Sequence, residues 1–300
     1  MKKKTVGIML SLSMAMSLMA CGSSTQPAAA SVDTEEPAAT TQAASTAEAT
    51  ASSTEAAADT AASTADVTTI KDGTLMVGVE IGYPPMEYFD TDGATPIGFD
   101  VEVANALADY LGLELVDTSW DGIFAGVDTG KYDCIISCVS ITDERKEQFN
   151  LTKPYVSNHT VLIVPNDSEI DSMEALNGHS TAVQAETTAD DYMKEHSAEL
   201  GAELFQYDKV INCFDDLKAG RTDSVFTDSV VAAYYFGDEA SNYKTVWEND
   251  ELEPIGICLK KGNDGLTQAI DDALDALSAD GTLGTIAEKY FGTDLTAGLR

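Results

Sequence analysis

The sequence predicts an α/β fold with parallel sheets, and three features of the chain support this class. From about residue 68 onward, short apolar segments typical of strands alternate with amphipathic segments typical of helices. Strands separated by helices are joined by crossovers, which favours parallel pairing. Polar side chains directly follow several of the strands, as they do where open α/β sheets bind ligands.

The predicted elements follow one another along residues 68–300, a region long enough for one large domain or two small ones. Its first part has strands at 74–80, 113–119 and 133–139 and helices at 100–112 and 121–130. Its second part has strands at 159–165, 180–185 and 223–228, and helices at 172–178, 188–196, 213–220 and 229–237. The final helices are expected at 265–281 and 284–292. The first of these has a face predicted to be buried, formed by Leu266, Ile270, Leu274 and Leu277.

Residues 1–21 predict a lipoprotein signal peptide. Three lysines precede an apolar run, Val6 to Ala20, that is too short for a membrane span. The run ends in LMAC, which resembles the bacterial lipobox, where the signal is removed before a cysteine that then carries lipid. Cys21 is therefore expected to anchor an extracytoplasmic protein to the cell membrane. The alternative is an ordinary signal peptide with a chance cysteine.

Residues 22–67 predict a disordered acidic tether. They consist mainly of Ala, Thr, Ser and Glu, with almost no large apolar side chains. Such a segment buries too little surface to offset the entropy of ordering it. A flexible coil of this length spans about 35 to 40 Å, enough to hold a domain near a membrane and leave it free to turn.

Composition limits the partners and cofactors. The formal net charge of -34 argues against nucleic acid as a partner, because binding to phosphate backbones needs clustered Lys and Arg. Cys134, Cys138, Cys213 and Cys258 match no zinc-binding spacing, and no metal or cofactor is expected. In an extracytoplasmic compartment these cysteines either form disulfides or remain buried free thiols, and the sequence does not choose.

The stretch SITDERK combines a helix start with an arginine. Thr142, followed by Asp143 and Glu144, is typical of a hydroxyl cap with negative charge in the first turn. Arg145 lies in the same turn, where a cation opposes the helix macrodipole. Either its side chain points into solvent, or an arginine and a helix N-terminus together form a site for an anion.

Other polar residues lie where the predicted strands end. These are Tyr83, Ser137, Ser140, Thr187, Thr188 and Asp228. Each Ser, Thr and Asp among them has an ordinary alternative as a helix N-cap, which is the commoner use of these residues. Together with Arg145 they supply a cation, an anion, hydroxyl groups and an aromatic ring. This set suits an α-amino acid.

Several separated stretches resemble, in the right order, the bacterial extracellular solute-binding proteins of family 3, the polar amino acid class that feeds ABC importers. The signature is GFDVEVANALADYL at 98–111. The other stretches are YPPMEYFD at 83–90, TSWDGIFAGVDTGKYDCIIS at 118–137, SITDERK at 140–146 and LKAGRTDSVFTDSVVAAYY at 217–235. The resemblance covers residues 74–296.

This resemblance implies a two-lobed periplasmic-binding-protein-like fold of type II. In that fold two strands link two α/β lobes, and the ligand lies in the cleft between them. On this chain the first lobe takes residues 68–158 and the second takes residues 159–252. Residues 253–300 then return to the first lobe as a strand and C-terminal helices. Ligand capture is expected to occur by hinge closure.

The resemblance also implies roles for individual residues. The residues expected at the ligand carboxylate are Arg145, Thr188 and Thr187. Those expected at the ligand ammonium are Asp228, Ser137 and Ser140. The expected side-chain pocket consists of Tyr83, Trp120, Glu80, Cys138 and Glu186, with Tyr83 and Trp120 as aromatic walls. Trp120 also has an alternative role as a core tryptophan.

Three departures from the family's usual pattern concern the ligand. Glu186 stands where a glycine commonly precedes the Ser/Thr pair, Cys138 where Gly or Ser is common, and Glu80 in place of a frequent Asp. The two glutamates either attract a cationic side chain, such as that of arginine, lysine or histidine, or point away. An acidic ligand would lack a second obvious cation in a strongly negative protein. A polar or basic amino acid is therefore favoured.

The expected function is that of a monomeric binding component of an ABC importer, which delivers a free amino acid to a membrane permease. One alternative is an enzyme, since the same fold is known to host dehydratases of small carboxylates. His159, His179 and His196 fall in no HExxH or GxSxG motif, and the complete set for carboxylate and ammonium favours binding. The other alternative is a protein that senses or sequesters its ligand without transport.

Overall fold

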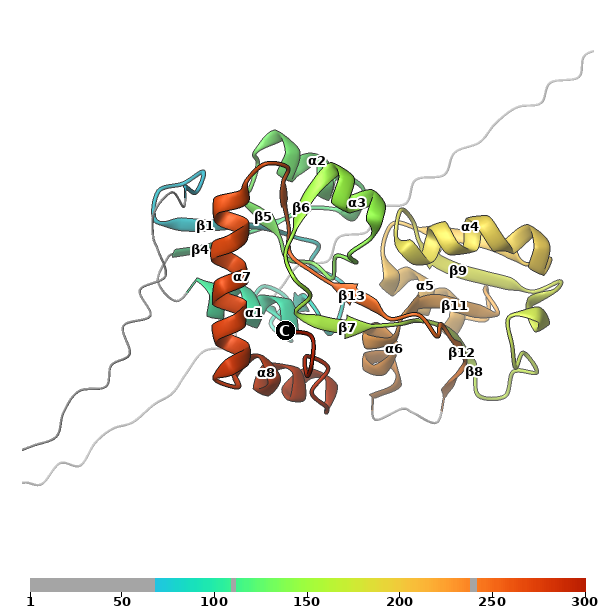
Figure 1. Cartoon of the computed structure of the whole chain (residues 1–300). Helices are drawn as coiled ribbons and strands as arrows, with labels where there is room; N and C mark the ends of the chain where they lie inside the picture. Colours follow the sequence, from blue (N-terminus) through green and yellow to red (C-terminus); the bar gives the residue numbers. More distant parts are fainter. Residues whose placement is uncertain (1–67, 109–111, 238–241) are drawn as a thin grey trace, which may run out of the picture. The chain divides into compact units, whose positions relative to one another are not determined.

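The computed structural model describes residues 68–108, 112–237 and 242–300 (Figure 1). The predicted signal peptide with Cys21 and the predicted tether, residues 22–67, lie outside the described residues. Within the described ranges, no helix is both long and apolar enough to cross a membrane.

The first lobe is built around a five-stranded sheet with the order β4-β1-β5-β14-β6. Strand β1 pairs in parallel with β4 and β5, whereas β14 pairs antiparallel with β5 and β6. The strands are β1 (Thr74–Val79), β4 (Gly112–Asp117), β5 (Cys134–Ile135), β6 (Phe149–Leu151) and β14 (Cys258–Lys260). A short hairpin is formed by β2 (Tyr88–Phe89) and β3 (Pro96–Ile97). The helices are α1 (Phe99–Leu107), α2 (Trp120–Thr129), α3 (Asp143–Gln148), α7 (Asp264–Ala279) and α8 (Thr282–Phe291).

The second lobe has a five-stranded sheet of the same kind, with the order β10-β9-β11-β8-β12. Strand β9 pairs in parallel with β10 and β11, and β8 pairs antiparallel with β11 and β12. The strands are β8 (Thr160–Pro165), β9 (Ser180–Gln184), β10 (Glu203–Tyr207), β11 (Ser224–Asp228) and β12 (Tyr243–Glu248). The helical elements are the short 3-10 helix η1 (Glu174–Leu176), α4 (Thr188–Leu200), α5 (Val210–Lys218) and α6 (Ser229–Phe236).

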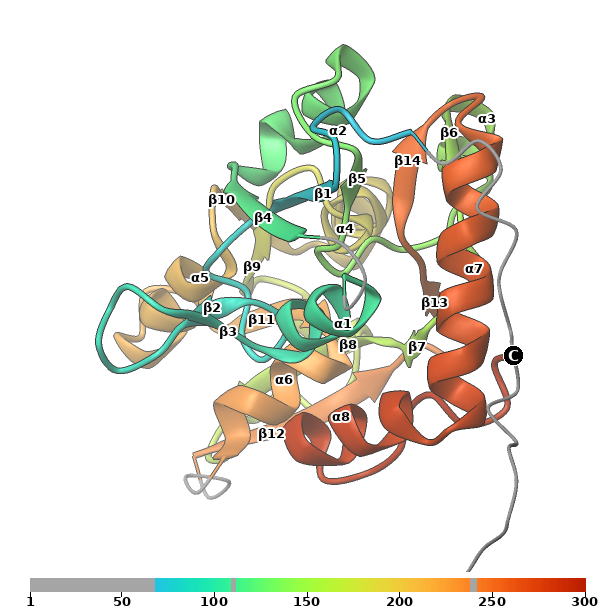
Figure 2. The ribbon, with the colours of Figure 1, turned by 90° about the vertical axis from the view of Figure 1, so that its left-hand side faces the viewer.

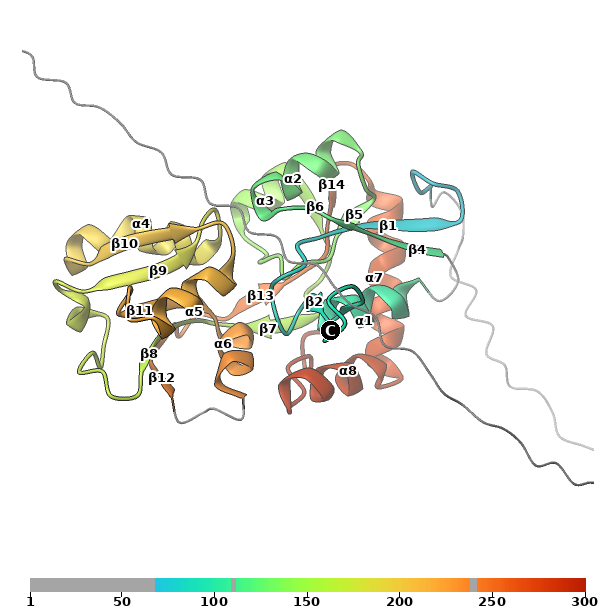
Figure 3. The same ribbon diagram turned by 180° about the vertical axis from the view of Figure 1, so that it is seen from behind.

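Two further strands link the lobes. Strand β7 (Val156–Asn158) leads into the second lobe, and β13 (Glu253–Ile255) leads back out of it. They pair antiparallel with each other, and Figures 1 and 3 show both running between the two sheets. The chain therefore crosses between the lobes twice, as the two-lobed prediction requires.

The prediction of parallel sheets was wrong for part of each sheet, because both sheets are mixed. The antiparallel members are β6 and β14 in the first lobe and β8 and β12 in the second. In the sequence, each of these strands is a neighbour of β7 or β13, the two strands that link the lobes. No helical crossover precedes β8 or β14, so the geometry that favours parallel pairing is absent there.

The two C-terminal helices pack on the first lobe, where α7, α8 and α1 lie against one another (Figure 2). Leu266, Ile270 and Leu274 are buried, as their helical spacing predicts, and Leu277 is partly buried against the same core.

A close contact between β1 and α2 positions the start of α2 at the cleft. A Cβ atom at Gly78 or Gly126 would lie within 2.4 or 2.1 Å of the Tyr132 side chain, so only glycine fits at both positions. The hydroxyl group of Tyr132 also donates to the carbonyl oxygen of Ile123 in α2. This packing holds Trp120, the first residue of α2, at the edge of the interlobe space.

Candidate functional site

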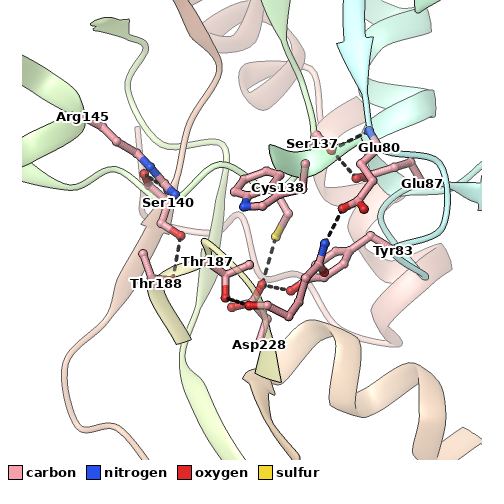
Figure 4. A pocket seen from close by; sticks show the side chains of 12 residues that line it. Glu80, Tyr83, Glu87, Ser137, Cys138, Ser140, Arg145, Thr187, Thr188 and Asp228 are labelled. Carbon is pink, nitrogen blue, oxygen red and sulfur yellow. Dashed lines mark hydrogen bonds between the residues drawn. The ribbon is translucent and has the colours of Figure 1, made fainter. Parts of the chain in front are cut away.

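A cavity lies between the lobes. The first lobe contributes Glu80, Tyr83, Glu87, Trp120, Ser137, Cys138, Ser140 and Arg145, and the second contributes Gln184, Thr187, Thr188 and Asp228. In Figure 4 Arg145, Ser140 and Thr188 lie at one end and Glu80 and Glu87 at the other, with Cys138 between them. The cavity therefore has a cationic end and an acidic end.

Arg145 lies at the cationic end and not in open solvent. Thr142 caps helix α3 as predicted, because its hydroxyl oxygen accepts a hydrogen bond of 3.1 Å from the backbone N–H of Arg145. The guanidinium carbon lies 5.6 Å from the centre of the Trp120 ring and 4.9 Å from that of Phe124. One guanidinium nitrogen donates to the carbonyl oxygen of Ser140. No described residue forms an ion pair with Arg145, so its charge faces the cavity without an acidic partner.

The N-terminus of α4 faces the same end. Thr188 is the first residue of that helix, where backbone N–H groups have no partner within the helix. Its hydroxyl oxygen lies 3.5 Å from that of Ser140, across the interlobe space. The Thr187 hydroxyl accepts from the backbone N–H of Asp190 and donates to the carbonyl oxygen of Gln184, so it acts as the helix cap. The combination of Arg145 and this helix start suits an anion.

Asp228 ends strand β11 and its side chain does not cap α6. The carboxylate accepts hydrogen bonds from the Tyr83 hydroxyl at 2.5 Å and from the Asn158 amide at 2.8 Å. The Cys138 thiol lies 3.7 Å away. Burial raises the pKa of Asp228 to about 7, and the neighbouring Glu253 carboxylate adds to the increase. A ligand cation beside this carboxylate would favour its ionised form.

The two serines have different positions. The Ser137 hydroxyl accepts from the backbone N–H of Glu80 and donates to Oε1 of Glu87, so both of these bonds are made within the first lobe. Ser140 presents its hydroxyl to the cavity, while its carbonyl oxygen holds Arg145. Ser137 therefore positions the acidic end, whereas Ser140 belongs to the cationic end.

Both predicted aromatic walls line the cavity and contact the opposite lobe. Tyr83 does so through Asp228. The Trp120 indole N–H donates a hydrogen bond of 2.9 Å to the carbonyl oxygen of Glu186. Trp120 is only 8% exposed, and it packs in a cluster of buried apolar residues, so it is a core residue and a wall of the cavity at once.

The acidic end contains two buried carboxyl groups. Glu80 accepts a hydrogen bond of 2.7 Å from the Gln184 amide, and Oε1 of Glu80 and Oε2 of Glu87 have no hydrogen-bond partner among the described residues. Burial raises the pKa of Glu80 to about 7, although Gln184 and Lys209 partly oppose this increase. Burial and the Asp100 carboxyl group hold the pKa of Glu87 well above its ordinary value.

Glu186 is the predicted pocket residue that lies elsewhere. It lines a neighbouring hollow, on the outer side of Arg145, that also contains Phe124, Glu144, Thr188 and Asp191. Its φ of 64° lies in the left-handed region, which explains why glycine suits this position. Its backbone N–H donates to Asp190 and its carbonyl accepts from Trp120, and these bonds hold the conformation. Its side chain does not reach the acidic end of the cavity.

Cys138 has a similar backbone. Its φ is 48°, again in the left-handed region, and its backbone N–H donates a 2.7 Å hydrogen bond to Asp100. Cys134, Cys213 and Cys258 are, like Cys138, buried free thiols, so none of the four described cysteines is in a disulfide. This result decides the alternative that the sequence left open.

Sequence reasoning missed two residues of the cavity, Glu87 and Gln184. Glu87 lies within the quoted stretch YPPMEYFD, but it does not end a strand. Gln184 is the last residue of β9, one position before the predicted strand end at Ala185. A long polar side chain at the carboxyl end of a parallel strand was the available signal.

The chain is similar to known proteins in both sequence and fold. The sequence model of bacterial extracellular solute-binding proteins, family 3, matches residues 75–293. The L-cystine-binding protein of Escherichia coli strain K12 is 33% identical over 228 residues, which cover 75% of this chain and 85% of that protein. The L-arginine-binding protein of Pseudomonas aeruginosa is 30% identical over 238 residues, covering 76% and 92%. A solved structure of an ancestral arginine-binding protein bound to arginine is 35% identical, with a TM-score of 0.69, and covers 73% of this chain and 99% of that one.

Proposed function

The chain belongs to family 3 of the bacterial extracellular solute-binding proteins, and on that premise we propose that it captures a basic amino acid between its lobes. It is the extracytoplasmic substrate-binding protein of an amino acid ABC transporter. Its relatives are non-enzymatic binding proteins, so it is a binding protein and not an enzyme. The ligand and the residues that hold it are the content of the proposal.

The α-carboxylate of the ligand binds at the cationic end. Arg145 supplies a planar fork of N–H donors that matches a carboxylate, and its charge has no acidic partner among the described residues. The start of α4 at Thr188 adds backbone donors and the positive end of a helix dipole. Thr187 caps this helix, and Ser140 holds the guanidinium in place.

The α-ammonium binds Asp228. The carboxylate is buried, and the Tyr83 hydroxyl donates a hydrogen bond to it. Because Asp228 belongs to the second lobe and Arg145 to the first, one amino acid contacts both lobes. Its binding therefore favours the closed arrangement over an open one, as hinge closure requires.

The proposed side chain of the ligand is inferred from the acidic end of the cavity. After the ligand's own ammonium and carboxylate are paired with Asp228 and Arg145, Glu80 and Glu87 remain, each with a buried oxygen that has no partner among the described residues. A basic side chain supplies both the donors and the positive charge. The dissociation of Glu80, whose pKa is raised to about 7 by burial, becomes more favourable beside such a cation.

Acidic amino acids fit this end less well than basic ones. Glutamate and aspartate would bring a second carboxylate toward Glu80 and Glu87, where the described lining offers no second cation. Like charges in a buried site repel strongly. Relatives that bind cystine and arginine are similarly close in sequence, so the chemistry of the cavity, and not the identity, favours arginine, lysine or ornithine.

Delivery to a membrane permease and attachment to the membrane complete the proposal. The protein carries a free amino acid as a monomer. Lipid on Cys21 anchors it to the membrane, and residues 22–67 tether it close to the permease. A neighbouring permease and ATPase in the genome would support transport, and a signalling partner would support sensing instead.

Isothermal titration calorimetry tests the ligand class. The protein is unfolded and refolded to remove carried-over ligand, then titrated with arginine, lysine, ornithine, histidine, glutamine, cystine and glutamate. We expect micromolar or tighter binding for at least one basic amino acid, equivalent to about 8 kcal/mol. Glutamate is expected to bind at least about 100-fold more weakly, a difference of about 2.7 kcal/mol. Tighter binding of glutamate or cystine would overturn the ligand class.

A further inference from the structure

We propose that Gln184, at the end of β9, determines ligand specificity by offering its amide oxygen to a guanidinium group in the cavity. Glu80 offers a carboxyl oxygen beside it, from the other lobe. These two atoms, Oε1 of Glu80 and Oε1 of Gln184, are called the acceptor pair below. This inference rests on the proposed function, because it assumes that the ligand is an α-amino acid.

The orientation of the Gln184 amide follows from its hydrogen bonds. Nε2 donates to Oε2 of Glu80 at 2.7 Å and to the carbonyl oxygen of Asp208 at 3.3 Å. A rotated amide would place its oxygen against that carbonyl oxygen, which can only accept. Because the Asp208 carbonyl oxygen has no proton to donate, this orientation is favoured whether or not Glu80 carries a proton. Gln184 therefore keeps its oxygen atom free for another donor.

Both members of the acceptor pair are buried and unsatisfied. Glu80 is 2% exposed and Gln184 is 4% exposed, and both line the cavity. Neither Oε1 atom has a hydrogen-bond partner of good geometry within the described part of the chain, although the backbone N–H of Trp120 acts on the Glu80 carboxyl group and lowers its pKa. Buried acceptors in native proteins are almost always paired, so such a pair in a cavity indicates a missing donor.

The direct bond between Nε2 of Gln184 and Oε2 of Glu80 links the two side chains that carry the acceptor pair. A ligand group that satisfies both oxygen atoms needs at least two N–H donors, and the charge of the acidic end favours a cation. The guanidinium group has five donors in a rigid plane and meets both conditions. An ammonium meets them with a single point charge, whereas a urea group keeps N–H donors but carries no positive charge.

Because the acceptor pair comes from two lobes, recognition of the side chain is linked to closure. An apolar side chain would leave both oxygen atoms without donors in the closed arrangement. In a site of this kind, the loss of binding free energy for a ligand without donors is larger than the gain for a ligand that has them.

Titration of the full chain with four probes tests this role. The probes are L-arginine, L-lysine, L-citrulline and L-norleucine, which share their α-groups and differ at the side-chain end. The variants are Gln184→Met, which has a similar length and no amide, and Gln184→Glu, which keeps an acceptor. Gln206→Met is the matched control, since this amide on the neighbouring strand β10 donates to Asp190 and does not line the cavity.

For the unchanged protein we expect arginine to bind at least about tenfold more tightly than citrulline or norleucine. Gln184→Met should weaken arginine binding about tenfold or more, which is the size expected for the loss of one hydrogen bond to a charged group. The same substitution should change the affinity for norleucine by less than about twofold. Gln184→Glu should retain the preference for arginine over citrulline. Gln206→Met should leave all four affinities unchanged.

Three results would overturn the proposal. An equal loss for all four probes in Gln184→Met would show that Gln184 only supports closure, and no loss at all would show that it has no role. Failure of the unchanged protein to bind arginine or lysine would also overturn it. In that case, the protein could still bind another amino acid. If Arg145→Ala removes that binding, the protein captures an amino acid as proposed, and only the role of Gln184 is wrong. Thermal unfolding of each variant confirms that it is folded.

Discussion

The hydroxyl group of Tyr83 donates a hydrogen bond of 2.5 Å to Oδ2 of Asp228, which joins the two lobes across the cleft. This bond opposes the effects of burial and of Glu253, which raise the pKa of Asp228 to about 7. Only the ionised carboxylate pairs with a ligand ammonium. Tyr83 therefore influences the pH below which the protein loses its ligand.

Replacing Tyr83 with phenylalanine should move that limit to higher pH. The ring is kept, but Asp228 loses a donor that lowers its pKa. Affinity should fall as the pH decreases in both proteins, and the midpoint of the fall should lie higher in Tyr83→Phe. Calorimetric titration from pH 5 to pH 9 with the identified ligand measures this midpoint. Tyr290→Phe is the control, because its hydroxyl bonds to Glu102. Identical profiles for Tyr83→Phe and the unchanged protein would contradict the assignment.

The same buried acids should make the ligand-free protein less stable as the pH rises. The pKa values of Asp228 and Glu80 are about 7 in the folded state, against 3.8 and 4.5 for the free groups, and burial is the main cause. Between about pH 4 and pH 7 the folded state therefore binds more protons than the unfolded state, so the free energy of unfolding decreases with increasing pH.

Urea unfolding at pH 5 and pH 8 measures this decrease in the protein and in Asp228→Asn. The variant cannot ionise at this position, so its loss of stability between the two pH values should be smaller by more than about 1 kcal/mol. The comparison between proteins removes the contribution of the other acidic residues. Equal losses in both proteins would show that Asp228 titrates at its ordinary pKa when folded.

The fold was predictable where strong local patterns coincide with the elements. The buried face of α7 and the strands β8 and β11 follow their predicted ranges closely. Strands β10 and β12 were missed, because both are only partly buried and neither forms a continuous apolar run. The predicted helix at 172–178 is only the short η1, since its place is fixed by packing of Leu176 and not by a helical stripe.

The site was predictable where chain position alone determines a role. Arg145 and Asp228 stand at element ends, and their placement follows from local sequence and from the family resemblance. Glu186 could not be placed in this way, because a left-handed backbone turns its side chain toward the outer hollow. Gln184 and Glu87 depend on contacts between distant segments, which no local pattern reports.

The four described cysteines should all react as free thiols after unfolding without a reductant. They are at most 5% exposed, and burial raises the pKa of each thiol, so the folded protein should react slowly at pH 8. Alkylation followed by peptide mass measurement resolves Cys134, Cys138, Cys213 and Cys258 individually. A peptide pair linked by a disulfide would contradict the structure.

Arg145 should be required for binding as a guanidinium and not only as a charge. Arg145→Ala should abolish detectable binding, and Arg145→Lys should weaken it by at least about tenfold, because an ammonium cannot form the paired bonds of the planar fork. Both variants should remain folded, since among the described residues the guanidinium bonds to the Ser140 carbonyl and packs on the rings of Trp120 and Phe124, without an ion pair.

Calorimetry with the identified ligand measures both variants of Arg145, and Arg221→Ala serves as the control. Arg221 forms an exposed ion pair with Asp216 on the second lobe, and its loss should leave the affinity unchanged. Affinity retained in Arg145→Ala would mean that the start of α4 holds the carboxylate alone. Full affinity in Arg145→Lys would mean that positive charge suffices, because only the fork geometry differs between the two cations.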